Sequence, residues 1–139
     1  MDRLAELRMA TAEAAFRLAV DHVSEVYDRA DIHLDARDLV SREAWRRFID
    51  AMVLAAGGSL RPLRSDALDR LLDRIALRDP ALQRGVTLAG AHIHIRKGAL
   101  LTFRRAPPRG GRRTEDDDPP DWNRASQLLC PSNLGPLWV

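Results

Sequence analysis

The sequence predicts an α+β fold in which a helical N-terminal half packs on a small antiparallel meander of three strands. Two observations carry this prediction. Apolar residues recur at helical spacing in the first half, whereas residues 86–104 alternate or run β-branched between tight-turn signals. From residue 106 onward the periodicity is lost, which predicts an irregular C-terminal tail.

The first predicted helix covers residues 3–27. Its alanine-rich composition favours helix, and its apolar residues fall roughly on one stripe. The residues of that stripe are Leu4, Leu7, Ala14, Leu18 and Val23. The segment Asp28 to Asp31 breaks the pattern, and Ile32-His33-Leu34 after it could form a short edge strand.

Two further helices follow. Ser41 is the expected N-cap of a strongly amphipathic helix that Gly57-Gly58 ends. Its apolar positions are Trp45, Phe48, Ile49, Met52 and Val53. Ser65 is the expected cap of the next helix, which Asp79-Pro80 ends. The apolar stripe of that helix is Leu68, Leu71, Leu72 and Ile75, which leaves Arg70 and Arg74 on the outer side.

The strands of the meander are expected at residues 86–88, 91–96 and 99–104, joined by turns at Ala89-Gly90 and Lys97-Gly98. The chain thus divides into a helical segment (1–57), a basic helix and meander (58–106), and a linker with an irregular tail (107–139). The tail contains Trp122, Leu128, Leu129, Leu137 and Trp138, for which we predict no helical or strand period.

Charge is distributed unevenly over the 139 residues. Residues 57–113 carry 13 basic and 4 acidic side chains, a net charge of +9 between flanks of −3 and −4. A basic block of this kind indicates a surface for a polyanion, although it could also simply be solvated. No apolar run approaches the roughly 18–20 residues of a membrane span, and we expect no secretory signal and a bacterial cytoplasmic location.

Metal and catalytic patterns are weak. Cys130 is the only cysteine, so no disulfide framework or thiolate cluster is expected. His92 and His94 would share one side of a strand, as half of a metal site, as a pair that stacks on bases, or as ordinary surface residues. The acidic run Glu115 to Asp118 is more consistent with a solvated linker than with a cation site. We predict no metal site.

Several short motifs, in order, resemble the region that follows the catalytic domain of tRNA(Ile)-lysidine synthases. They are Gly57-Gly58, Arg61-Pro62-Leu63-Arg64, Leu68-Asp69-Arg70-Leu71-Leu72, Arg84-Gly85-Val86-Thr87-Leu88-Ala89-Gly90-Ala91 and Arg96-Lys97-Gly98-Ala99-Leu100-Leu101-Thr102-Phe103-Arg104-Arg105. The likeness covers about residues 41–106. Arg105 is a departure, because the family commonly has Glu there.

The resemblance implies a role in tRNA modification. Enzymes of this family use ATP and lysine to convert a wobble cytidine to lysidine, and their S-G-G-x-D-S loop holds pyrophosphate. This chain contains no such loop, so we expect it to be non-catalytic, to bind no cofactor and to bind tRNA, with ATP and lysine used by a separate catalytic domain. The expected phosphate contacts are Arg61, Arg64, Arg70, Arg74, Arg96, Lys97, Arg104 and Arg105. A protein–protein interaction module and an inactive remnant of a split gene remain the alternatives.

Overall fold

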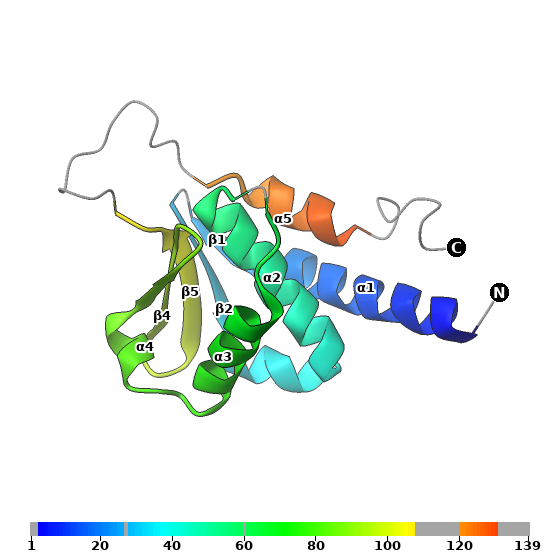
Figure 1. Ribbon diagram of the computed structural model, residues 1–139, viewed down its shortest axis with the longest axis horizontal. Helices are drawn as coiled ribbons and strands as arrows, with labels where there is room; N and C mark the ends of the chain where they lie inside the picture. The colour runs from blue at the N-terminus through cyan, green and yellow to red at the C-terminus, as the bar shows by residue number, and fades with distance from the viewer. Residues whose placement is uncertain (1–2, 27, 60, 108–119, 131–139) are drawn as a thin grey trace.

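A computed structural model describes residues 3–26, 28–59, 61–107 and 120–130 of the protein (Figure 1). Helices and strands occur in separate runs along the chain, an α+β arrangement as predicted. The elements are α1 (Arg3–Asp21), β1 (Ser24–Val26), β2 (Arg29–His33), the 3-10 helix η1 (Leu34–Leu39), α2 (Arg42–Gly57), α3 (Ser65–Ala76), α4 (Ala81–Arg84), β3 (Val86–Leu88), β4 (Ala91–Arg96), β5 (Leu100–Arg105) and α5 (Trp122–Leu129).

The sheet is larger than the predicted meander. It has five antiparallel strands in the order β1-β2-β5-β4-β3. The predicted strands β3, β4 and β5 and their two turns are present, and the turn residues Ala89, Gly90, Lys97 and Gly98 all have positive φ. The β3–β4 connection is a two-residue loop whose left-handed geometry matches the strand twist, and the β4–β5 connection has the same geometry at Lys97 and Gly98 in a loop of three residues.

The sequence interpretation of residues 22–34 was wrong in the end of the helix and in the bounds and edge position of the strand. The helix predicted over 3–27 ends at Asp21, and Ser24–Val26 forms an edge strand instead. The strand expected at 32–34 is β2, which spans Arg29–His33 and lies inside the sheet between β1 and β5. The buried carboxylate of Asp31 concealed this strand, because an acidic residue is rare in an inner strand.

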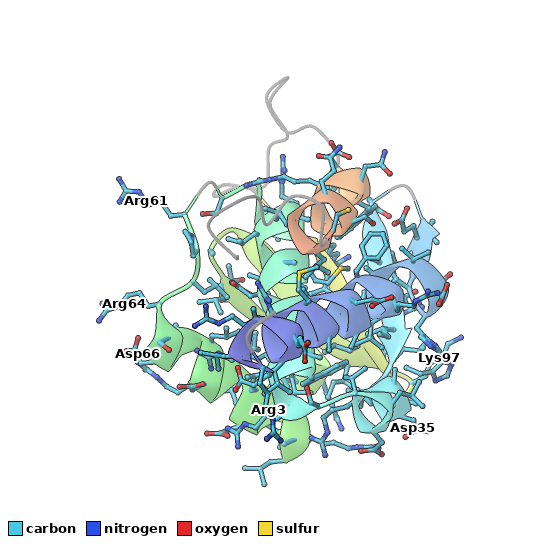
Figure 2. All side chains as sticks on the ribbon, turned by 90° about the vertical axis from the view of Figure 1, so that its right-hand side faces the viewer. Arg3, Asp35, Arg61, Arg64, Asp66 and Lys97 are labelled. Carbon is cyan, nitrogen blue, oxygen red and sulfur yellow. The ribbon has the colours of Figure 1, made fainter. Side chains whose placement is uncertain are left out.

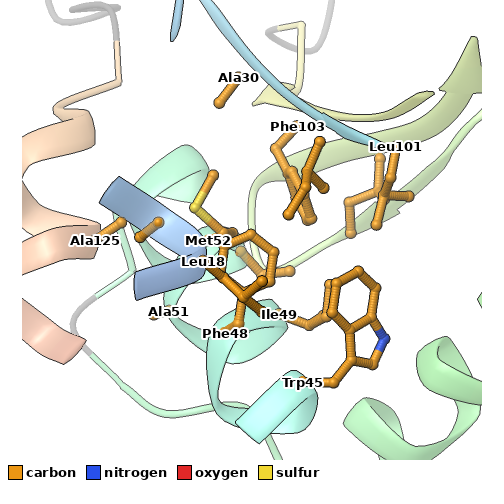
Figure 3. Close-up of a cluster of buried hydrophobic side chains, with 14 of the residues drawn as sticks. Leu18, Ala30, Trp45, Phe48, Ile49, Ala51, Met52, Leu101, Phe103 and Ala125 are labelled. Atoms are coloured by element: carbon orange, nitrogen blue, oxygen red, sulfur yellow. The ribbon is translucent and has the colours of Figure 1, made fainter. Parts of the chain in front are cut away.

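Helix α2 forms the centre of the core, as its amphipathic pattern predicted. The Ser41 hydroxyl accepts a hydrogen bond from the Ala44 amide at 3.1 Å, and Gly58 ends the helix in a left-handed conformation with φ 70°. Phe48 is fully buried, stacks on Trp45 at 5.5 Å and meets Phe103 of β5 edge-on at 6.5 Å (Figure 3). One face of the sheet is thereby sealed against α2.

Helix α1 packs against α2 through only part of its length. Leu18 is buried, as predicted, together with alanines of the same face, whereas Leu4 and Leu7 are 54 % and 56 % exposed. The predicted apolar stripe was therefore wrong for the first two turns of α1. Small residues at Ala12, Ala15 and Ala19 allow the close helix contact, a role that a search for large apolar side chains does not detect.

Helix α3 has the predicted buried stripe, but Ser65 is its first residue rather than its N-cap. Arg64 occupies the cap position, and no side chain caps that end. The Ser65 hydroxyl instead accepts a hydrogen bond from Arg46 of α2 at 2.7 Å. Arg70 and Arg74 are exposed on the outer side of α3, as predicted.

The C-terminal tail is not entirely irregular, which corrects the prediction for residues 120–130. Asp121 caps α5 by accepting a hydrogen bond from the Asn123 amide at 3.1 Å. Trp122, Ala125 and Leu129 are buried at helical spacing, and α5 packs on α1 and α2. The helical period was missed for two reasons. Its middle position is Ala125, which is small, and Leu128 is apolar but exposed and so lies off the buried stripe. The predicted acidic linker run, Leu137 and Trp138 lie outside the described residues.

Candidate nucleic-acid interface

The two faces of the sheet differ in chemistry because side chains alternate along each strand. In β4, Ala91, Ile93 and Ile95 are buried towards α2, while the intervening side chains point to the other side. We call that side the outer face. Its side chains are Ser24, Val26, Arg29, Asp31, His33, Thr87, His92, His94, Arg96, Leu100, Thr102 and Arg104. In Figure 1, α1, α2 and α5 lie together on one side of the sheet.

A buried carboxylate organises the centre of the outer face. Asp31 is 7 % exposed, and the Thr102 hydroxyl donates a hydrogen bond to its Oδ1 at 2.6 Å. Arg96 Nη2 donates to Oδ2 at 3.1 Å, and Arg29 Nε lies 3.4 Å from the same oxygen. One negative charge is thus shared between arginines of two strands that flank β5, which orders both guanidinium groups over the sheet.

The outer face retains unused hydrogen-bonding capacity. Four buried side-chain nitrogens of the described residues have no hydrogen-bond partner in the protein, and three of them lie here: Arg29 Nε, Arg96 Nε and His94 Nδ1. Arg29 Nε is within ion-pair distance of Asp31, but its N–H is not aligned for a hydrogen bond. Because buried polar groups are normally satisfied, their concentration on one face favours a polar ligand there.

The two histidines of β4 share the outer face, as predicted, with ring centroids 5.4 Å apart. Burial lowers the pKa of His92, and the charge of Arg104 lowers it further. Burial also lowers the pKa of His94, and the charges of His92 and Arg104 lower it further. Both rings are therefore neutral at pH 7, where they offer aromatic surfaces and ring nitrogens rather than positive charge.

Strand alternation places the hairpin residues predicted as phosphate contacts on different sides of the sheet. Arg96 and Arg104 lie on the outer face, and Lys97 is exposed in the turn between β4 and β5. Arg105 points the other way. Its Nε donates to the carbonyl of Ala56 at 3.4 Å, so this side chain satisfies the C-terminal end of α2.

The remaining predicted contacts lie elsewhere. Arg61, Arg64, Arg70 and Arg74 are exposed on α3 and the turn before it, where Asp66 pairs with Arg70 at 3.0 Å and with Arg64 at 3.5 Å. Arg61 and Arg64 project from the side of the protein opposite Lys97 (Figure 2). Seven of the eight predicted residues therefore fall into two separate basic groups, and Arg105 belongs to neither.

Sequence reasoning missed the contribution of β2 to the site. Arg29, Asp31 and His33 lie on the outer face, while Ala30 and Ile32 between them are buried. This period of two is visible in the segment Arg-Ala-Asp-Ile-His and could have identified the strand. The partners of Asp31 in β4 and β5 are 65 and 71 residues away, so no local pattern reveals them.

Comparisons with protein-family models, with curated proteins and with solved structures found no match to this chain. Within the described residues, no three side chains of histidine, cysteine, aspartate or glutamate converge as a metal site would require. The described helices also include none with the length and apolar character needed to cross a bilayer. The outer face is thus interpreted from its own geometry.

Proposed function

We propose that the protein binds RNA through the outer face of its sheet, and that the RNA is a tRNA, as the resemblance to the post-catalytic region of tRNA(Ile)-lysidine synthases implies. The observation that carries the proposal is the collection of Arg29, Arg96, Arg104 and the two β4 histidines on a sheet face that α2 leaves uncovered. In this proposal the chain binds tRNA and a separate catalytic domain supplies the chemistry with ATP and lysine.

The chemistry of the face suits RNA. Arginine donates planar, paired N–H groups that match phosphate oxygens. Neutral histidine rings are among the aromatic surfaces on which unstacked RNA bases lie, and antiparallel sheets present such platforms in several RNA-binding modules. The net charge of +9 over residues 57–113 adds long-range attraction for a polyanion.

Titration of labelled tRNA over a series of salt concentrations tests the proposal, with fluorescence anisotropy as the measurement. We expect the double variant Arg29→Gln/Arg104→Gln to lose on the order of tenfold in affinity and to flatten the log–log salt slope by about one to two units, by analogy with duplex DNA. The matched control is Arg70→Gln/Arg74→Gln, which removes the same charge from the exposed side of α3.

The outcomes separate the two basic groups. A larger effect of the α3 control would move the RNA site to the turn and α3, and would leave the outer face without a role in binding. Equal affinity and parallel salt slopes for the wild type and both variants would overturn RNA binding through either group. Unchanged melting temperatures would show that the variants act on binding and not on folding.

A protein partner is the second candidate, favoured by one observation. The exposed Leu4 and Leu7 of α1 line a groove with Leu63 and Leu68, beside the charged side chains of α2. Partner binding there should be less sensitive to salt than RNA binding, because it does not neutralise a series of backbone phosphates. Leu4→Ser/Leu7→Ser should abolish that binding without changing affinity for tRNA, whereas loss of tRNA affinity would make the groove part of the RNA site.

A further inference from the structure

We propose that Arg29, Arg104 and His92, one from each of three neighbouring strands, form a binding site for a phosphate group. The identification of its cellular occupant as an RNA phosphodiester rests on the proposed function. The site itself is argued from the register of the sheet, the distribution of charge and the placement of the histidine ring.

The register places the three side chains in one row. Arg29 of β2 is the direct partner of Arg104 of β5, and Arg104 is the direct partner of His92 of β4. Directly opposed side chains on antiparallel strands have Cβ atoms roughly 4.5–5.5 Å apart, and like charges in this position destabilise a sheet. A phosphate above the row would replace this repulsion with attraction to its oxygens.

The positive charge of Arg104, in the middle of the row, is not neutralised by the described side chains around it. Asp31 neutralises part of the charge of Arg29 and Arg96. Arg104 is exposed and, among the described residues, has no carboxylate within ion-pair distance. Arg29 keeps 37 % of its side chain exposed. Both guanidinium groups are thus reachable from solvent, and Asp31 holds one of them in place.

The backbone before β3 positions the histidine. Gly85 has φ 99°, and a β-carbon at this position would lie 2.2 Å from His92 Nε2, so the imidazole occupies space that only glycine leaves open. The groups that face His92 are Arg104 from β5, Thr87 from β3, the Gly85 backbone and His94 from its own strand. None of these is acidic, so nothing in its immediate surroundings competes with an anion.

Phosphate and proton binding should consequently be linked. Without an anion, burial and Arg104 lower the pKa of His92. A bound phosphate offsets the charge of Arg104 and accepts a hydrogen bond from the protonated ring, so it should raise that pKa. Linkage is reciprocal: a rise of about one unit corresponds to about tenfold tighter phosphate binding by the protonated protein.

Histidine NMR tests the site directly. We would follow the Cε1–Hε1 signal of His92 through pH titrations of the full chain in inorganic phosphate and in chloride at equal ionic strength. Phosphate should raise the pKa of His92 by about one unit relative to chloride. The signal of His22, which lies beyond the end of α1, controls for general ionic effects.

Two variants keep the test specific. Arg104→Gln should raise the pKa of His92 in chloride, because a neighbouring positive charge is removed, and should abolish the difference between phosphate and chloride. Arg74→Gln on α3 removes the same charge elsewhere and should preserve the wild-type difference. A phosphate-induced shift of equal size in wild type and Arg104→Gln would overturn the site.

A parallel titration with tRNA distinguishes this inference from the proposed function. If phosphate shifts His92 and tRNA neither shifts it nor competes, the phosphate site stands and RNA binding through this face fails. A shift of the His92 pKa with tRNA supports both the phosphate site and RNA binding through the outer face. This holds even if inorganic phosphate causes no shift, because the RNA backbone supplies the same phosphate chemistry. The absence of a shift with either ligand overturns the phosphate site.

Discussion

The inner and outer faces of the sheet are made by alternate residues of the same strands, yet their side chains differ in polarity and in burial. The inner side chains of β4 and β5, such as Ile93, Leu101 and Phe103, are fully buried against α2. The outer side chains of β2, β4 and β5 are mostly charged or polar, and they include the buried carboxylate of Asp31 and the directly opposed Arg29 and Arg104.

The difference separates the interactions that stabilise the fold from the polar groups that remain available to the proposed ligand. Burial of apolar area on the inner face is favourable whatever the detailed geometry. The outer face contains an unfavourable pairing of Arg29 with Arg104, together with buried nitrogens that lack protein partners. We therefore expect the outer face to contribute less to stability than the inner face, in keeping with the proposed role in binding.

The sharpest test of this difference uses two consecutive residues of β5. Phe103→Ala empties a fully buried position of the inner face and should lower the free energy of unfolding by about 3–5 kcal/mol. Arg104→Ala on the outer face should change it by less than about 0.5 kcal/mol, or raise it slightly as the repulsion with Arg29 disappears. Urea unfolding measures both, and similar losses would show that the outer face is structural.

The next largest effect is expected at the buried carboxylate. Asp31→Asn keeps the size of the side chain but leaves Arg29 and Arg96 without their shared counter-charge, which should cost about 1–3 kcal/mol. Both arginines are partly exposed and can be rehydrated, so a larger loss is not expected. Asp35→Asn in η1, at an exposed carboxylate, is the control. Equal stability of both variants would mean that Asp31 does not organise the outer face.

The smallest effect concerns pH. Because the pKa values of His92 and His94 are lowered on folding, the unfolded chain binds protons more readily. Their contribution to stability is complete above the ordinary pKa of about 6.5 and declines as the pH falls below it. Melting temperatures should therefore fall less steeply on acidification in His92→Gln/His94→Gln than in wild type. Identical slopes would show that the two rings titrate as they do in the unfolded chain.

The elements that could be predicted from sequence are those whose large apolar residues keep a regular period. Helix α2, the buried stripe of α3 and the strands β3 to β5 meet this condition. The buried face of α5 has an alanine between Trp122 and Leu129, and three of the four buried residues of α1 are alanines, which carry little hydropathic signal. Strand β2 was concealed by charged residues whose partners come from the other half of the chain.

The sequence by itself determined the α+β class, the core around α2, the turns of the β4–β5 and β3–β4 hairpins and the presence of a basic central block, because all of these follow from local period and composition. Only the tertiary structure decided which basic residues lie together. The register of β2 on β5 brings Arg29 beside Arg104, strand alternation turns Arg105 towards α2, and Arg61 and Arg64 project from the side of the protein opposite Lys97 (Figure 2). Such relations arise from contacts between distant segments, and no local pattern contains them.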